Sequence, residues 1–505
     1  MKRVLYLLSI VVLLGQSSCN NFLEDSSGDL LIPKNVKEFQ ALLWGDGYPH
    51  KLAENITWMI LLSDDVSMKP FNNSTKDRVD ARTMGDGLYP YRWDLNIEEK
   101  IKDKAWPYIY ERILACNNVI TALPTMECEK GEEDKIAWLG GAAHTLRAYY
   151  YFCLVNWYSE PYSEENINKP GVVIRTEPNI TLGDVKRSSI GDTYKLINSD
   201  LSTAMNYFSK GRKVTNKKLV TEDAAKFLAN RVALFEGRWA DVIKGGKEIL
   251  EKYNDLYNLN NSPAKATFKY YNLSTCFSVL STDFNPEIIY SFSNPASSNP
   301  YLYFTIYPNN YDIGFLTSEE NLISTYKTND LRKTAYYRAD SIRFGRVKFS
   351  GNYLPVKYSG INRNNCYFMN WRSAEVLLNV AEAYARTDNG VSASAVALLQ
   401  KLEISRYDGT YTPLTVANFT SKEELLKYVL AERRRELAFE ETMRWWDIRR
   451  LGCEQITHKY YHTRTEFDTY ILPKGSPNFT LQIPASEVDE NETIQRNERV
   501  VINKQ

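Results

Sequence analysis

The sequence contains few histidines and no excess of charge of either sign. Among its 505 residues are 4 His, while Lys plus Arg and Asp plus Glu both number 62, so the formal net charge is zero. Without a basic surplus no long-range field attracts a phosphate backbone, and we expect no nucleic-acid partner. So few histidines also disfavour a histidine-based active site.

Cysteine is sparse as well, and its spacing is wide. The seven cysteines form no CxxC pair and no Cys/His cluster, which leaves a zinc site or a thioredoxin-like motif without support. No P-loop, dinucleotide-binding glycine motif, HExxH, GxSxG or EF-hand loop is present either. We therefore predict no metal and no cofactor. Scattered buried thiols are preferred over disulfides for Cys116, Cys128, Cys153, Cys276, Cys366 and Cys453.

The chain has one conspicuous apolar run, and it lies at the N-terminus. Lys2 and Arg3 precede the run from Val4 to Leu14, which is typical of a secretory signal peptide and too short to span a bilayer comfortably. Small residues then lead to Cys19, as in a bacterial lipobox. We predict that residues 1–18 are removed and that Cys19 is acylated, for example with palmitate, which tethers the chain without a transmembrane helix. The alternative is an ordinary cleavage site with an incidental cysteine.

Aromatic residues are abundant, with 35 Tyr, 20 Phe and 10 Trp. Many of the Tyr and Trp side chains must lie partly exposed, where each offers an apolar ring face and a polar group. This composition favours a binding surface. The 43% hydrophobic and 25% charged residues are otherwise ordinary for a folded protein in water, and the length suffices for two to four domains or for one large domain with insertions.

Helical periodicity dominates several stretches. Apolar residues recur at three- and four-residue spacing in residues 105–123 and 136–158, which predicts two amphipathic helices. Two helical hairpins are expected over 221–253, broken at 236–238, and over 371–405, broken at 388–390. They resemble degenerate tetratricopeptide units. The sequence thus predicts a mainly α protein, a tetratricopeptide-like scaffold with long irregular loop insertions and a few short strands.

Two loop-like regions carry the candidate binding residues. Residues 254–370 and roughly 63–96 lose helical periodicity, and a strand is expected near 287–292. Flat rings suit the C–H faces of sugars, and amides suit their hydroxyl groups. The candidate ligand-binding residues, led by Trp93 and Tyr301, are Tyr89, Tyr91, Trp93, Asn96, Tyr301, Tyr303, Tyr307 and Tyr311.

The stretch from Ala431 to Gly452 combines charge with aromatic residues. It extends an apolar helix stripe into Arg433, and a buried arginine needs partners. Glu436 and Glu440 lie one and two turns away, which predicts an internal ion-pair network with a structural role. The stretch resembles the C-terminal signature of the SusD/RagB family, the surface nutrient-binding lipoproteins of the Bacteroidetes. The resemblance is carried by Glu432, Arg433, Glu436, Leu437, Phe439, Glu440, Arg444, Trp445, Trp446, Asp447 and Arg450.

Further segments match the family in order along nearly the whole chain. Where the family often has glycine after the second glutamate, this chain has Glu441. The resemblance implies one SusD-like domain over 19–505, with an N-terminal part to about 253, a loop-rich insertion to about 370 and a C-terminal helical part. The matching segments are residues 19–24, 62–65, 108–120, 146–152, 373–383 and 481–488.

The resemblance also implies a function. It implies a non-catalytic lipoprotein, lipid-anchored on the outside of the outer membrane, that captures oligosaccharide and delivers it to a SusC-like TonB-dependent transporter. Two alternatives stay open: the same role with peptide as cargo, and a secreted glycan-active enzyme. For the enzyme, the sharpest candidates are Asp64 and Asp65, although adjacent carboxylates more often pair locally.

Overall fold

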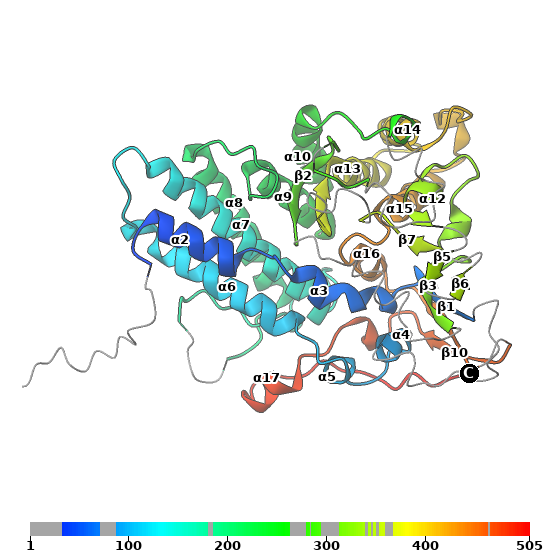
Figure 1. Cartoon of the computed structure of the whole chain (residues 1–505), viewed down its shortest axis with the longest axis horizontal. Coiled ribbons are helices and arrows are strands. Elements are labelled where there is room, and N and C mark those ends of the chain that lie inside the picture. Colours follow the sequence, from blue (N-terminus) through cyan, green and yellow to red (C-terminus); the bar gives the residue numbers. More distant parts are fainter. Residues whose placement is uncertain are drawn as a thin grey trace, which may run out of the picture.

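A computed structural model gives the architecture. It describes residues 33–70, 87–179, 185–262, 279–282, 284–293, 313–338, 342–344, 347–349, 353–358, 367–462 and 465–505. The described chain is mainly helical, as predicted. The long helices between residues 105 and 210 lie at one end of the molecule, and several short strands lie with the C-terminus at the other (Figure 1). Within the described residues no helix is long and apolar enough to cross a membrane.

Helix α7 (Glu133–Tyr158) runs through the centre of the helical end. Every residue from Trp138 to Tyr158 is buried, as expected for a helix that is apolar on all sides. Two glycines of α7 allow its neighbour α8 (Ile190–Lys210) to pack closely against it. A Cβ at Gly140 would lie 2.8 Å from the Tyr207 ring, and one at Gly141 would lie 2.8 Å from the Phe208 ring. The two helices therefore approach more closely than side chains at these positions would allow.

The two expected hairpins are present. Helices α9 (Glu222–Phe235) and α10 (Trp239–Lys252) are separated at Gly237, whose φ of +68° is a left-handed conformation that glycine adopts at little cost. Thr221 caps α9, since its side chain accepts a hydrogen bond from the amide of Ala224. Helices α13 (Ser373–Thr387) and α14 (Ala393–Arg406) form the second hairpin. The predicted breaks are thus confirmed.

The remaining helices are mostly short. Two further long ones are α6 (Ala105–Ala122), which was predicted, and α15 (Lys422–Leu437), which carries the signature. The others are α2 (Val36–Leu42), a π-helix η1 (Leu43–Gly47), α3 (Leu52–Ile56), a 3-10 helix η2 (Thr57–Leu62), α4 (Leu88–Tyr91), α5 (Ile97–Lys100), α12 (Arg332–Ala335), α16 (Met443–Arg450) and α17 (Ala485–Asp489). Single 3-10 turns occur at Leu123–Thr125, Leu259–Asn261, Ile323–Thr325, Val416–Asn418 and Pro477–Phe479.

The strands of the described chain form two-stranded antiparallel pairs. The expected strand is present as β2 (Ile288–Phe292), which is fully buried and pairs with β8 (Met369–Arg372). The other pairs are β1 (Val66–Pro70) with β3 (Ile313–Thr317), β4 (Tyr337–Arg338) with β7 (Leu354–Pro355), β5 (Ile342–Phe344) with β6 (Val347–Phe349), and β9 (Ile456–Tyr461) with β10 (Phe467–Leu472).

One apolar core joins the two ends of the molecule. It runs from Val36 through α7 to Ile494 and includes residues of α6 to α10, α13 and α16. A smaller second cluster fills the space between α13, α14 and α15. The elements that carry the candidate site are therefore supported from several directions at once.

Candidate functional site

The predicted aromatic cluster at residues 89–96 divides into buried and exposed members. Trp93 has no exposed surface, and its indole N–H donates to the Leu62 carbonyl at 3.0 Å. Tyr91 is equally buried, and its hydroxyl accepts from the Met68 amide at 2.9 Å. Neither ring presents a face to solution in this conformation.

Both buried rings stack on the imidazole of His458 in β9. The ring centroids lie 4.2 Å from Tyr91 and 4.3 Å from Trp93, with planes nearly parallel, so one ring covers each face of the imidazole. The Nδ1 atom of His458 lies 2.7 Å from the Tyr91 carbonyl oxygen. Burial lowers the pKa of His458 to about 4. The stack fastens the 89–96 segment to the β9–β10 pair and is part of the packing.

The members with solvent-accessible surface are Tyr89 and Asn96. Tyr89 is half-buried, with the Lys100 ammonium 4.6 Å from its ring centroid. Asn96 is exposed in a left-handed conformation, with φ +56°, directly before α5. Its side-chain amide forms no hydrogen bond within the described part of the chain, and so it is available to a ligand. The other candidates, Tyr301, Tyr303, Tyr307 and Tyr311, lie outside the described residues, as does Cys19.

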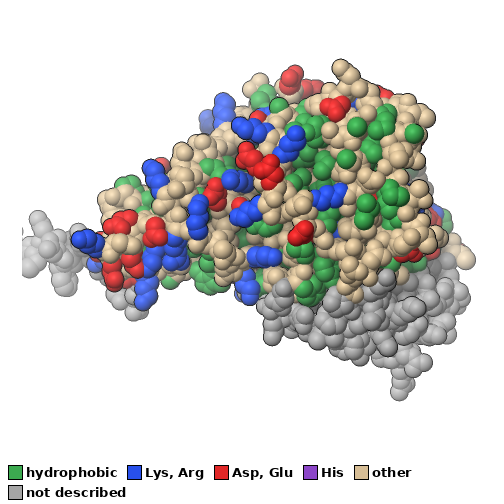
Figure 2. Space-filling model, turned by 90° about the horizontal axis from the view of Figure 1, so that it is seen from above, with side chains coloured by type: hydrophobic (Ala, Val, Ile, Leu, Met, Phe, Trp, Pro, Cys, Tyr) green, Lys and Arg blue, Asp and Glu red, His purple; other side chains and the backbone are tan. Residues whose placement is uncertain are grey.

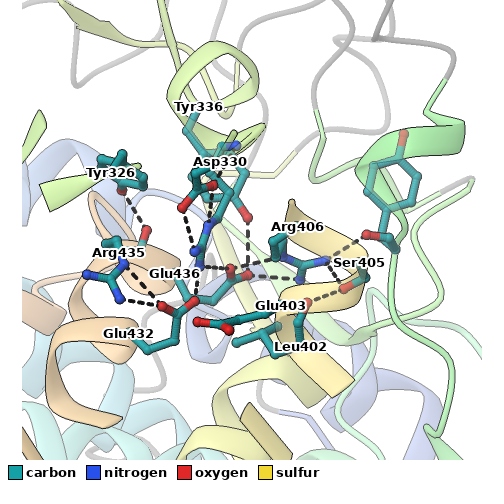
Figure 3. Close-up of polar contacts among 12 residues, drawn as sticks. Tyr326, Asp330, Tyr336, Leu402, Glu403, Ser405, Arg406, Glu432, Arg435 and Glu436 are labelled. Carbon is teal, nitrogen blue, oxygen red and sulfur yellow. Dashed lines mark hydrogen bonds and ion pairs between the residues drawn. The ribbon is translucent and has the colours of Figure 1, made fainter. Parts of the chain in front are cut away.

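The signature residues lie in a buried web of ion pairs centred on Glu436. Its Oε1 accepts from Arg372 and Arg406, both at 2.9 Å, and its Oε2 accepts from Arg332 at 3.1 Å. Figure 3 shows Arg406 and Glu436 at the centre, with Glu432 and Arg435 beside them. Burial raises the pKa of Glu436, but the arginine charges outweigh burial and hold this pKa well below its usual range. The web ties α14 and α15 to the segment around α12 and β8.

Glu440 joins the same web from the turn after α15. It accepts hydrogen bonds from Arg372 at 2.6 Å and from Lys357 at 2.8 Å. Lys357 is buried, and burial lowers its pKa to about 8. Glu432, the next signature acid, pairs with Arg332 at 2.6 Å. The acids of the signature thus face arginines and a lysine from other elements and satisfy the charge of those groups.

Arg433 has different partners from those expected. Its guanidinium bonds Asp447 at 2.9 Å and the Asn379 side chain at 2.6 Å, and neither Glu436 nor Glu440. On a helix, Arg433 and Glu436 point to adjacent but distinct faces, and α16 brings Asp447 to the face of the arginine. Asp447 also accepts a hydrogen bond from Nε of Arg450, and Nη1 of the same guanidinium donates to Glu382 of α13. This second group fastens α13, α15 and α16 together.

Two further signature residues, Arg444 and Trp445, connect α16 to other segments of the chain. Arg444 forms a bidentate pair with Asp64, with distances of 2.7 and 2.8 Å. Trp445 is buried and stacks on Phe479, with centroids 5.4 Å apart. Arg444 thus joins two segments that are 380 positions apart, whereas the Trp445 indole N–H is buried without a hydrogen-bond partner among the described residues.

The adjacent carboxylates Asp64 and Asp65 are engaged by arginines. Asp65 pairs with Arg434 at 2.7 Å, while Asp64 pairs with Arg444. Burial raises the pKa of Asp64, but the hydrogen bonds and charge of Arg444 outweigh burial, and the pKa falls to about 2. Asp64, held ionised in this way, is a poor general acid. Burial outweighs the charge of Arg434 at Asp65 and raises the pKa of that carboxyl. The pair is built as an ion-pair connection between the η2 segment and the signature.

Two hollows border these elements. The smaller, about 20 Å³, lies under the signature turn between Ile60 and Trp445 and has room for a single water molecule. The larger, about 170 Å³, lies beside Trp44 and Trp138. We did not predict the larger hollow. Its signal in the sequence is the aromatic run Trp44, Tyr48 and His50 around two glycines, outside both loop regions.

Metal and redox chemistry find no anchor in the described chain. Within the described ranges no three His, Cys, Asp or Glu side chains are grouped as ligands for a metal ion. The described cysteines are free thiols, with Cys116 and Cys153 buried and Cys128 and Cys453 half-buried.

Fold and site together define a class: a helical-hairpin scaffold, fastened by buried ion pairs, that presents loops and ring-lined hollows. Two family models match the sequence, one described as "SusD family" over residues 293–499 and one described as "Starch-binding associating with outer membrane" over residues 48–234. Together they cover most of the chain. The chain belongs to the SusD/RagB family.

Individual relatives agree with this assignment. "SusD-like protein P2" of Formosa agariphila is 33% identical over 150 residues, which is 28% of this chain and 26% of that protein. The match therefore spans only about a quarter of the relative's length.

Solved structures share the fold across nearly the full chain. A SusD superfamily protein of Bacteroides thetaiotaomicron superposes with a TM-score of 0.66 at 18% identity, covering 92% of this chain and 100% of its own. A SusD-like carbohydrate binding protein of Bacteroides vulgatus superposes with a TM-score of 0.64 at 18% identity, covering 91% and 97%. At this identity the likeness shows the fold alone.

Proposed function

We propose that this chain captures oligosaccharide outside the outer membrane and passes it to a SusC-like TonB-dependent transporter, without cleaving it. The observation that carries the proposal is family membership over both halves of the chain. The description of one matching family model names starch binding and the outer membrane, and one structural neighbour is a carbohydrate binding protein. These descriptions support sugar as the cargo.

The chemistry of the described residues favours binding over hydrolysis. A glycosidase needs one carboxylic acid that holds a proton and a second carboxylate across the substrate. The sharpest candidates, Asp64 and Asp65, are instead both paired with arginines. For ligand contact we propose the half-buried Tyr89 and the exposed Asn96, and the predictions for Tyr301, Tyr303, Tyr307 and Tyr311 stand beside them. Figure 2 shows acidic and basic side chains interspersed on one face, as suits a neutral ligand.

The test is retention in native gels that contain soluble polysaccharides, with the products of prolonged incubation analysed by chromatography. We expect slowed migration in at least one glycan and no release of shorter sugars. Tyr89→Ala together with Asn96→Ala should weaken retention, whereas Phe467→Ala, a change at an exposed ring on β10, should not. Release of sugars would establish an enzyme, and binding of a peptide library in place of every glycan would change the cargo.

We also propose that Cys19 carries the lipid anchor and that the mature chain faces the cell exterior. Acyl chains contribute about 0.8 kcal/mol of membrane affinity per buried CH₂, so several chains hold a protein stably. Cys19→Ser should move the protein from the membrane fraction to the soluble fraction. Mild detergent extracts of the wild type should yield a complex with a large β-barrel protein. Full release of the unchanged protein by salt alone would contradict the anchor.

A further inference from the structure

A ring-lined hollow opens at the N-terminal side of the helical end. It measures about 170 Å³ and is bordered by α2, η1, the start of α7 and the segment before α9. Its lining residues are Gln40, Leu43, Trp44, Tyr48, Trp138 and Leu219. An engineered apolar cavity of about 150 Å³ accepts benzene, so this hollow has room for one six-membered ring.

Two walls of the hollow are fixed by hydrogen bonds to the backbone of the same residue, Val220. The amide of Val220 donates to the Tyr48 hydroxyl at 3.0 Å, and the Val220 carbonyl accepts from the Trp138 indole at 3.0 Å. Both rings are buried to within 2% of their surface. Their polar groups are thus used in holding the walls in place, and the rings are set before any ligand arrives.

The third ring, that of Trp44, is exposed but is held in place by contacts with a neighbouring residue. Trp44 is 44% exposed, the largest exposed ring among the described tryptophans. It lies on η1, a π-helical turn, which is a rare conformation that often occurs at functional sites. The His50 ring packs edge-on against Trp44 at 4.7 Å, and its Nε2 lies 2.6 Å from the Trp44 carbonyl oxygen. An aromatic face is therefore held open beside the hollow.

Polar groups with unused capacity accompany these rings. The half-buried Gln40 amide, with two donor hydrogens and an acceptor oxygen, forms no hydrogen bond within the described chain. The Arg212 guanidinium lies over the Trp138 ring, 5.5 Å from its centroid. Arg212 forms no ion pair with a described residue, and its Nε is buried without a partner. Free donors thus lie next to apolar walls.

We propose that this hollow is a binding site for a single pyranose ring of a glycan, with Trp44 as its stacking face and Gln40 as its hydroxyl-binding group. A pyranose combines apolar C–H faces with a polar edge, and the hollow combines ring walls with the Gln40 amide. A purely apolar ring would leave the Gln40 amide without a partner, at a cost in affinity. The proposal rests on the proposed function, and it places a sugar site outside the 89–96 cluster.

The test uses the full mature chain labelled with 5-fluorotryptophan. The Trp44 resonance in ¹⁹F NMR is the one that Trp44→Phe removes. Methyl pyranosides of glucose, galactose, mannose and xylose are added one by one, and N-acetyltyrosinamide is the aromatic comparison. We expect at least one methyl pyranoside to shift the Trp44 resonance. Trp44→Ala should weaken its binding about tenfold, while Trp44→Phe should retain most of it.

The matched control is Phe467→Ala, which removes a ring of similar exposure, 42%, on β10 and should leave binding unchanged. Gln40→Leu should weaken binding of the pyranoside but not of N-acetyltyrosinamide. If the wild type retains polysaccharide while the Trp44 resonance stays still and Trp44→Ala binds normally, this site is refuted and the proposed function stands. If only N-acetyltyrosinamide moves the resonance, the hollow accepts protein side chains and the proposal is overturned. Absence of all glycan binding by the wild type overturns both.

Discussion

Arg231 is the clearest single residue on which the packing depends. Its guanidinium is fully buried and bonds Glu375 at 2.7 Å and Glu441 at 2.8 Å. Glu441 has a φ of +47°, a strained conformation for a side-chain-bearing residue, in the position where the family often has glycine. Burial raises the pKa of Glu441. The ion pair with Arg231 therefore offsets both the strain and the burial of a carboxylate.

Replacing Arg231 should leave the buried carboxylates of Glu375 and Glu441 without a counter-charge. We expect Arg231→Met, which keeps most of the volume, to lower the free energy of unfolding by about 3–5 kcal/mol, because an uncompensated buried charge costs that much. The loss should shrink as the pH falls, since the stranded carboxylates then take up protons. Urea denaturation at pH 7.5 and pH 5 measures both effects.

The control is Lys195→Met, which breaks an exposed pair with Asp192 and should leave the midpoint nearly unchanged. Equal effects of the two substitutions would show that Arg231 contributes no more than a surface charge.

Residue-level predictions from the sequence succeeded only in part, for a physical reason. That charged residues of the signature need partners follows from the cost of burying charge, and the web around Glu436 supplies them. Which partner each residue has depends on the placement of other elements. Arg433 meets Asp447 only because α16 turns back beside α15. Likewise, the composition of the 89–96 segment could not reveal that Trp93 is buried against His458, because that histidine lies on a strand more than 360 positions away.

At the scale of one element, α6 begins beside a carboxylate that pairs with no cation among the described residues. Asp103 accepts hydrogen bonds from the Trp58 indole and the Ala105 amide, both at 3.1 Å, and from the Tyr158 hydroxyl at 3.0 Å. Burial raises its pKa to about 6, above the value of an unfolded aspartate. Above pH 6 the folded state must therefore hold a costly charge, and as the pH falls through 6 it gains a proton and stability.

Asp103→Asn should remove this dependence. The amide oxygen keeps both N–H donors, and the amide nitrogen can donate to the Tyr158 oxygen. We expect the variant to be more stable than the wild type above pH 6, by up to about 3 kcal/mol, with the difference vanishing near pH 4. Thermal unfolding from pH 4 to pH 8 measures it. Asp489→Asn, at an exposed position, should follow the wild type throughout. A variant that loses stability above pH 6 would show that Asp103 is needed in its charged form.

Helices with strong periodicity were predictable as elements. The sequence predicted the bounds of six helices to within a few residues: α6, α7, α9, α10, α13 and α14. Helix α8 was not predicted, although Ser189 caps it and its apolar residues Tyr194, Ile197 and Leu201 recur at three- and four-residue spacing. The pairing of β2 with β8 was also beyond prediction, because nearly 80 residues separate these strands and no local pattern specifies long-range pairing.

At the scale of the whole molecule, buried ion pairs connect segments that are far apart in the sequence. Glu287 bonds both Arg372 and Arg406 at 2.6 Å, and Asp64 bonds Arg444 across 380 positions. The main apolar core likewise extends from Val36 to Ile494. Neither half can open without exposing apolar surface and unpaired charge of the other. We therefore propose that the described part of residues 33–505 unfolds as a single unit, in line with the one domain expected from the sequence.

This proposal predicts equal protection at both ends of the described chain. In native-state hydrogen exchange, the slowest amides of α7 and of α15 should open with the same free energy, because only global unfolding exposes them. Arg406→Met removes a buried partner of Glu287 and Glu436, and it should lower both values together by about 3–5 kcal/mol. Lys474→Met, which breaks an exposed pair with Glu454, should lower neither. If Arg406→Met weakened α15 while α7 kept its protection, the two ends would be separate cooperative units, and the buried web would stabilise only its own neighbourhood.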